Sequence, residues 1–137
     1  MRRPRARAVA DPVLDASAVL AVIFDEPGAN LVANYLPGAR ISAVNAAEVM
    51  SKLADLGMPQ ETIEAVMEGL QLTISPFDMS DARESARLRP LTRNAGLTLG
   101  DRSCLALARQ FEAPAVTADQ AWSRLDDAIG ITIELVR

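Results

Sequence analysis

The sequence predicts an α/β domain built on a mainly parallel sheet of about five strands. Short apolar runs that suit buried strands alternate with longer runs in which apolar residues recur every three to four positions. This alternation is typical of parallel strands joined by helices. The strand candidates are Val13–Leu14, Arg40–Val44, Leu72–Ile74, Ala115–Thr117 and Ile131–Leu135. With 137 residues and 50% apolar side chains, the chain is long enough to bury a core of its own.

Helical periodicity fills the intervals between these strand candidates. Apolar residues form one stripe over residues 49–56 and a second over 63–70, and Gly57 and Pro59 between them are helix-stop and helix-start signals. Two further helices are expected at 81–93, which is more polar, and at 101–112. Because there is no internal repeat and no long linker, we expect a single domain over residues 11–137.

The first ten residues carry four arginines and no acid, and we interpret them as a flexible basic arm. The arm does not resemble a secretion signal, because Asp11, Pro12 and Asp15 interrupt the place where an apolar segment would follow. The longest apolar run near the start, Val19–Phe24, is far shorter than the roughly 20 residues of a membrane span. The single cysteine, Cys104, excludes an intramolecular disulfide and is expected in the core. We therefore expect a soluble, cytoplasmic protein without membrane contact.

The chain contains no histidine. This excludes Ser-His-Asp triads, Cys-His pairs, histidine-ligated zinc sites and an imidazole base. Neither a GxxxxGK[ST] loop nor a GxGxxG loop is present, so nucleotide binding through those phosphate-binding loops is not supported. Catalysis would have to use carboxylates, hydroxyls, arginine, water and a metal ion.

The formal net charge of −4 gives no general attraction to nucleic acid. Thirteen of the fourteen basic residues are arginine, and six of them lie within residues 83–109. Arginine suits bidentate contacts to phosphate. A solvated helix face with ion pairs such as Glu84 to Arg87 is the simpler interpretation of this run.

Four carboxylates stand where an apolar run gives way to a helix-start signal: Asp15, Glu48, Asp101 and Asp119. In parallel α/β sheets the working groups gather at the carboxyl ends of the strands, so these acids could converge on one crevice. An oxygen-only pocket with excess negative charge would suit a hard divalent cation such as Mg²⁺ or Mn²⁺. Ser17, two residues after Asp15, is interpreted as a cap or a phosphate-site hydroxyl.

Each acid also has a purely structural explanation, because carboxylates are favoured at helix N-termini. Thr98 to Asp101 and Asn45 to Glu48 both match the capping-box spacing. Asp101 argues for more than capping, because it continues the apolar stripe of its helix, and a buried charge there is costly unless it is paired. Asp15 raises the same problem at the end of a buried strand.

Taken together, three segments resemble the PIN-domain ribonucleases, specifically the VapC-type toxins of bacterial toxin–antitoxin pairs: VLDASAVLAVIFDEPGA, ISAVNAAEVMSKLADLG and LTLGDRSCLALARQFEAPAVTADQAWSRL. The motifs follow the family's order, with LDASA first, an alanine-flanked glutamate after the second strand, LGDRxCLALA next and TADxxW last. The resemblance covers the chain from Val13 to Val136. It implies a PIN-like three-layer α/β/α sandwich around the parallel sheet.

The resemblance implies a metal-dependent endoribonuclease that hydrolyses RNA phosphodiester bonds. Asp15, Glu48, Asp101 and Asp119 would be its catalytic residues and would hold one or two Mg²⁺ ions, for which Mn²⁺ can substitute. Glu48 or Asp119 could help to activate the attacking water. The candidates for contacts to the substrate or to the acids are Ser17, Asn45, Arg102 and Thr117.

The family further implies a tRNA or another structured RNA as substrate, a homodimer or higher assembly, and a VapB-like antitoxin that neutralises the growth-inhibiting toxin. Two alternatives stay open. The first is a metal-dependent phosphatase or DNA nuclease on the same scaffold. The second is a non-catalytic partner-binding domain whose acids only cap helices.

Overall fold

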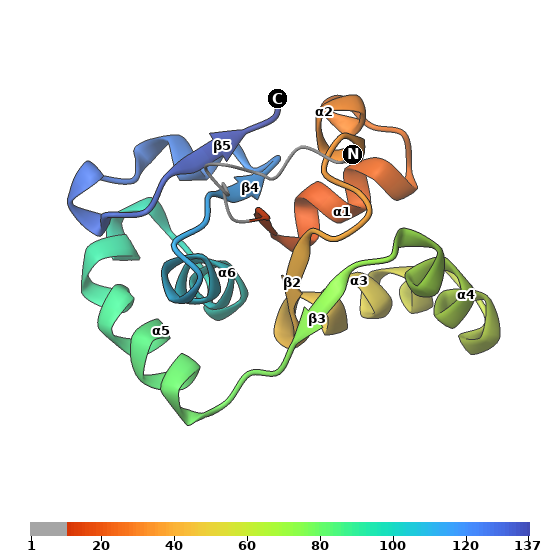
Figure 1. Cartoon of the computed structure of the whole chain (residues 1–137), viewed down its shortest axis with the longest axis horizontal. Helices are drawn as coiled ribbons and strands as arrows, with labels where there is room; N and C mark the ends of the chain where they lie inside the picture. Colours follow the sequence, from red (N-terminus) through yellow and green to blue (C-terminus); the bar gives the residue numbers. More distant parts are fainter. Residues whose placement is uncertain (1–10) are drawn as a thin grey trace, which may run out of the picture.

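The computed structural model describes residues 11–137, so the basic arm predicted for residues 1–10 lies outside the described residues. Five strands form one sheet in the order β3-β2-β1-β4-β5, and every neighbouring pair is parallel (Figure 1). The strands are β1 (Val13–Leu14), β2 (Arg40–Ser42), β3 (Thr73–Ser75), β4 (Ala115–Thr117) and β5 (Ile133–Leu135). The predicted α/β class with a parallel sheet is confirmed.

Helices cover both faces of this sheet. The α-helices are α1 (Ala16–Ile23), α2 (Ala29–Ala33), α3 (Ala43–Asp55), α4 (Gln60–Leu70), α5 (Met79–Thr92) and α6 (Leu99–Gln110). Short 3-10 helices are η1 (Arg93–Ala95), η2 (Gln120–Arg124) and η3 (Asp127–Ile129). Figure 1 shows α1 to α4 on one side of the sheet and α5 and α6 on the other. Across residues 11–137, no helix combines the length and the apolar character needed to cross a bilayer.

The two faces of the sheet hold two separate apolar clusters, because neighbouring residues of a strand point to opposite faces. Leu14 of β1 and Val116 of β4 pack with residues of α1 to α4, whereas Val13 and Ala115 pack with residues of α5 and α6. Cys104 is buried in the second cluster, as the sequence predicts. Helices, sheet and helices therefore form the three layers of the predicted sandwich.

The junction between β2 and α3 differs from the prediction. The sequence suggested a strand as far as Val44 and a capping box from Asn45 to Glu48. Instead, the Ser42 hydroxyl accepts a hydrogen bond from Val44 N at 3.2 Å, so the strand ends at Ser42 and the helix begins at Ala43. Glu48 consequently lies in the second turn of α3 and caps nothing.

The two edge strands are also displaced from their predicted ranges. β3 ends at Ser75 because Ser75 pairs with Ser42 at the end of β2. β5 begins at Ile133, two residues later than predicted, because η3 ends at Ile129 and Gly130, with a φ of 71°, then turns the chain before the strand. With these shifts, all five predicted strands are present.

Candidate active site

The candidate site lies at the carboxyl ends of three neighbouring strands. β2, β1 and β4 are adjacent and parallel, so their carboxyl ends reach the same edge of the sheet. Asp15 directly follows β1, and Asp119 comes two residues after the end of β4. The chain leaves β1 toward β2 and later returns to the other side of β1 as β4 (Figure 1). Asp15 and Asp119 thus lie on either side of the point where the strand order reverses, and open α/β sheets commonly bind their ligands at such a point.

Asp15 is the most buried of the four acids, with 3% of its surface exposed. It caps α1, since its Oδ1 accepts a hydrogen bond from Ala18 N at 2.8 Å. The Ser17 hydroxyl donates to Oδ1 at 2.7 Å, and the Thr117 hydroxyl donates to Oδ2 at 2.5 Å. Burial nevertheless raises the pKa of Asp15 from 3.8 to about 6, and the charge of Asp101 adds to the rise. In the described part of the chain, no basic side chain pairs with Asp15.

The hydroxyls of Ser17 and Thr117 connect β4 to the turn after β1. Ser17 Oγ accepts a hydrogen bond from Ala118 N at 2.9 Å, and Thr117 Oγ1 accepts one from Asp119 N at 3.0 Å while donating to Asp15. Of the two roles predicted for Ser17, the helix cap is wrong, because Asp15 fills the cap position, and the phosphate-site hydroxyl stays a prediction. Both hydroxyls hold the Asp15 carboxylate instead.

Replacing Thr117 with valine keeps the shape of the side chain and removes its hydroxyl. We expect the free energy of unfolding at pH 7 to fall by about 1–3 kcal/mol, because the Asp119 N–H and the Asp15 carboxylate each lose a hydrogen-bond partner. Thr117→Ser keeps the hydroxyl and is the matched control, which we expect to retain most of the stability. Urea unfolding measures both variants, and a valine variant as stable as the wild type would contradict this role.

Asp101 and Asp119 each take part in a helix cap. Asp101 Oδ2 accepts a hydrogen bond from Thr98 N at 2.9 Å, and Thr98 Oγ1 accepts one from Asp101 N at 3.2 Å, so the predicted capping box is confirmed and α6 begins at Leu99. Asp119 caps η2, since its Oδ1 accepts from Ala121 N at 2.9 Å. Burial raises the pKa of Asp101, and the charge of Asp119 raises it further. Asp101 and Asp119 therefore both cap helices, and their negative charges also repel each other.

Glu48 reaches the site from α3 and is held by Asn45. Asn45 Nδ2 donates to Glu48 Oε1 at 2.8 Å and to the carbonyl oxygen of Gly100 at 3.0 Å, which ties α3 to the start of α6. Asn45 is 1% exposed, and its Oδ1 atom is buried without a hydrogen-bond donor in residues 11–137. An ion pair from Glu48 to Lys52 does not form within this described range. Asn45 therefore orients Glu48 across the contact between two helices.

The four acids lie around one region of the molecule. Burial raises the pKa of the Cys104 thiol, and the charges of Asp15, Asp101 and Glu48 raise it further. The charge of Asp119 acts in turn on Asp101. Over residues 11–137, no three carboxylate or thiol groups stand close enough together to enclose a metal ion. The structure thus brings the predicted acids into one neighbourhood, and the metal-binding set itself is a proposal.

The chemistry of this neighbourhood fits a hard divalent cation. Its charged groups are carboxylates, which are the ligands that Mg²⁺ and Mn²⁺ prefer. Asp15 is a buried carboxylate whose hydrogen bonds do not offset its burial, and a cation would relieve that cost. The unpartnered Asn45 Oδ1 is an acceptor that a coordinated water could satisfy. These features suit a divalent cation in general and do not distinguish Mg²⁺ from Mn²⁺.

Arg102 follows Asp101 on α6 and points toward α5. Its Nη1 donates to the Ser85 carbonyl oxygen at 2.9 Å, and its Nε is buried without a partner among the described residues. Burial and the nearby charge of Arg89 lower the pKa of Arg102, whereas Asp101 raises it. Glu84 and Arg87 form the predicted ion pair at 3.2 Å. Arg102 is therefore a cation beside the acids that no described carboxylate neutralises at contact distance.

Gly100 is the site residue that the sequence interpretation missed. A β-carbon on Gly100 would lie 2.6 Å from Oε1 and 2.7 Å from Cδ of Glu48. The only signal in the sequence is a glycine inside a predicted helix start, one residue before a candidate acid. Its meaning depends on a side chain from a distant segment, which local patterns do not reveal.

The chain is similar to known proteins over most of its length. The model of the PIN domain family matches residues 13–128. No curated protein gives a significant sequence match. Solved structures with similar folds include a toxin–antitoxin complex from Klebsiella pneumoniae, with a TM-score of 0.69 and 18% identity over 92% of this chain and 98% of that chain.

Two further solved structures are VapBC complexes bound to DNA. The one from Rickettsia felis, which holds a DNA fragment from its promoter, has a TM-score of 0.66 and 19% identity over 91% of this chain and 98% of that chain. The one from Salmonella typhimurium has a TM-score of 0.66 and 20% identity over 91% and 97% of the two chains. At sequence identities of 18–20%, these similarities show a shared fold and nothing more specific.

Proposed function

The chain belongs to the PIN-domain family, and from this premise we propose that it is a metal-dependent endoribonuclease that inhibits growth until a cognate antitoxin neutralises it. Membership of the family implies hydrolysis of phosphodiester bonds. The observation that carries the proposal is the buried Asp15 carboxylate, unpaired with any described cation, at the carboxyl edge of the sheet, with Asp101 close enough to raise its pKa. A fold that keeps like charges together in this way favours a cationic ligand.

The residues proposed to hold Mg²⁺, or Mn²⁺ in its place, are Asp15, Glu48, Asp101 and Asp119. A bound divalent cation supplies a Lewis acid that lowers the pKa of water and neutralises charge on phosphoryl oxygens. The chain itself fixes the Asp15 oxygens through the Ser17 and Thr117 hydroxyls. Glu48 is solvent-exposed and Asp119 partly so, and either carboxylate is proposed to accept a proton from the attacking water.

A partner is proposed on two grounds. Solved structures with this fold include toxin–antitoxin complexes. Phe24 at the end of α1 and Leu31 in α2 are large apolar residues that are 39% and 51% exposed, and an antitoxin segment is proposed to cover them. We further propose a homodimer or higher assembly, as the resemblance implies.

The direct test of the proposed function uses the chain purified free of any partner. A pool of tRNA and structured RNA is incubated with Mn²⁺, Mg²⁺ or EDTA. We expect discrete cuts with either metal and none with EDTA. Intact RNA in every lane, under conditions in which the chain is folded, would contradict the proposal.

The alternatives separate in the same assay. A DNA nuclease or a phosphatase would cleave single-stranded DNA or a phosphomonoester at least as fast as RNA. A non-catalytic domain would cleave none of the three substrates and would lose only stability when its caps are removed, by about 1 kcal/mol for each cap.

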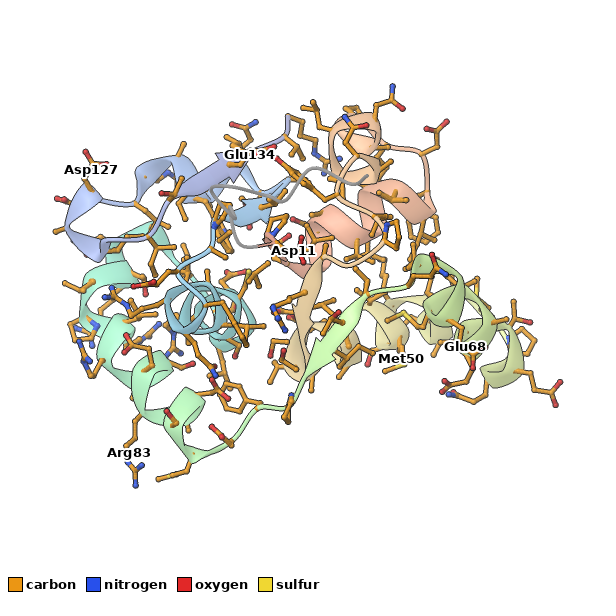
Figure 2. All side chains as sticks on the ribbon, in the orientation of Figure 1. Asp11, Met50, Glu68, Arg83, Asp127 and Glu134 are labelled. Atoms are coloured by element: carbon orange, nitrogen blue, oxygen red, sulfur yellow. The ribbon has the colours of Figure 1, made fainter. Side chains whose placement is uncertain are left out.

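Arg102 is proposed to contact a phosphate of the RNA backbone, because it lies next to Asp101 without a carboxylate partner at contact distance in residues 11–137. We expect Arg102→Gln to weaken RNA binding in EDTA and to reduce the salt dependence of that binding by about one phosphate contact. Arg83→Gln is the matched control, since Arg83 is exposed and points away from α5 into open space (Figure 2). Fluorescence anisotropy at several salt concentrations measures both variants. An unchanged salt slope for Arg102→Gln would contradict this role.

A further inference from the structure

In the first turn of α6, the residue that contacts the Glu48 carboxylate is Gly100, which has no side chain. Gly100 is buried, and a β-carbon there would overlap the Glu48 carboxylate, with Oε1 at 2.6 Å, Cδ at 2.7 Å and Oε2 closer still. Real β-carbons essentially never come within 3.0 Å of another group in this way. The carboxylate therefore occupies the space that any other residue type at position 100 would fill.

A hydrogen-bonded side-chain amide also stabilises this contact between Glu48 and Gly100. Asn45 Nδ2 donates both to Glu48 Oε1 at 2.8 Å and to the Gly100 carbonyl oxygen at 3.0 Å. The buried side-chain amide of Asn45 thus holds the Glu48 carboxylate against the backbone of Gly100. Asp101, the next residue of α6, is the neighbouring acid of the proposed site.

Backbone conformation does not explain the glycine. Gly100 lies within α6 and does not adopt the left-handed conformation that favours glycine. Glycine in a helix interior costs about 0.5–1 kcal/mol relative to alanine. Gly69 in α4 shows the contrast, because a β-carbon there would meet nothing within 4 Å. Gly100 differs from Gly69 because its missing side chain leaves space for the Glu48 carboxylate.

We propose that Gly100 is a positioning residue, whose missing side chain lets the Glu48 carboxylate lie against α6 beside Asp101 and join the divalent-cation site. The inference rests on the proposed function, since it assigns Glu48 to that site. Glu48 as a whole residue is exposed, and a methyl group at position 100 would meet only the carboxylate at the end of its long side chain. The methyl group would therefore turn that carboxylate away without unfolding the chain.

The test compares Gly100→Ala with Gly69→Ala in the full chain, by thermal unfolding without metal and by calorimetric titration with Mn²⁺ in the absence of RNA. We expect both variants to melt at or above the wild-type temperature, because alanine favours the helix at both positions. We expect Gly100→Ala to bind Mn²⁺ about 10- to 100-fold more weakly. Gly69→Ala should bind Mn²⁺ as the wild type does.

A double-mutant cycle shows whether the effect passes through Glu48. In a Glu48→Ala background, Gly100→Ala should weaken Mn²⁺ binding no further, because there is no carboxylate left to displace. If Gly100→Ala alone melts below the wild type, adding Glu48→Ala should restore the lost stability, because it removes the overlap. Failure of either result overturns the inference.

The remaining outcomes separate the inference from the proposed function. Wild-type Mn²⁺ affinity in Gly100→Ala overturns the inference and leaves the proposed function standing. A wild-type chain that binds no Mn²⁺ overturns both.

Discussion

Replacing Asp15 with asparagine should reduce metal-dependent RNA cleavage by on the order of 10³-fold while the chain stays folded. Asparagine keeps the size of the side chain and is as good a helix N-cap as aspartate, so α1 should still begin at Ala16. What disappears is the buried negative charge that lies beside Asp101. Single-turnover cleavage of a defined RNA in Mn²⁺ measures the loss.

The matched control for this substitution is Asp78→Asn. Asp78 is also an N-cap aspartate, since its side chain accepts a hydrogen bond from Asp81 N at the start of α5. It belongs to a separate capping box and carries none of the contacts described for the acids. We expect Asp78→Asn to cleave RNA at the wild-type rate. Equal rates for Asp15→Asn and Asp78→Asn would show that Asp15 acts only as a cap.

In EDTA, the stability of the wild-type chain should fall by about 2 kcal/mol relative to Asp15→Asn as the pH rises from 4 to 7. The native state holds the Asp15 proton up to a pKa of about 6, whereas the unfolded state loses it near 3.8. Between these values the native state binds more protons, so raising the pH favours unfolding. At pH 7 the charge is buried at full cost unless a cation is bound.

Urea unfolding at several pH values, with the wild type and Asp15→Asn side by side, isolates this contribution. Asp81, whose pKa is also raised and which lies outside the site, occurs in both chains and cancels in the difference. Adding Mn²⁺ at pH 7 should stabilise the wild type and leave Asp15→Asn almost unchanged. Parallel pH profiles for the two chains would contradict a buried, strained Asp15.

The architecture could be predicted from the sequence because it depends on local patterns, such as helix caps, and on the alternation of apolar strands with helices. The parallel sheet and the helices on both of its faces follow from short apolar strands joined by helices, and Val13 and Leu14 divide between the two cores as adjacent strand residues must. The Thr98–Asp101 capping box was also visible, because both partners lie within one turn.

The predictions that failed needed information from outside the local segment. Asn45 and Glu48 had capping-box spacing, yet Ser42 started the helix earlier and left Asn45 free to reach the carbonyl oxygen of Gly100 on α6. Ser17 resembled a cap, but its hydroxyl bonds to Asp15 and to the backbone after β4. In both cases a contact between distant segments decided the role of a polar side chain.

The capping and functional explanations of the acids are not exclusive. Asp15, Asp101 and Asp119 all accept hydrogen bonds from helix N-termini, and their charges also act on one another. Caps hold a carboxylate in a fixed direction by one of its oxygens and leave the other for different partners. The helix starts therefore orient the acids of the proposed site.

The most direct test of the central claim is a crystal structure of the chain grown with Mn²⁺, with anomalous scattering recorded at the manganese edge. The account predicts a manganese peak within coordination distance of Asp15 and Asp101, with Asp119 or Glu48 drawn in to complete the oxygen ligands. Absence of a peak there, at a Mn²⁺ concentration that saturates RNA cleavage, or peaks confined to surface acids elsewhere, would contradict it.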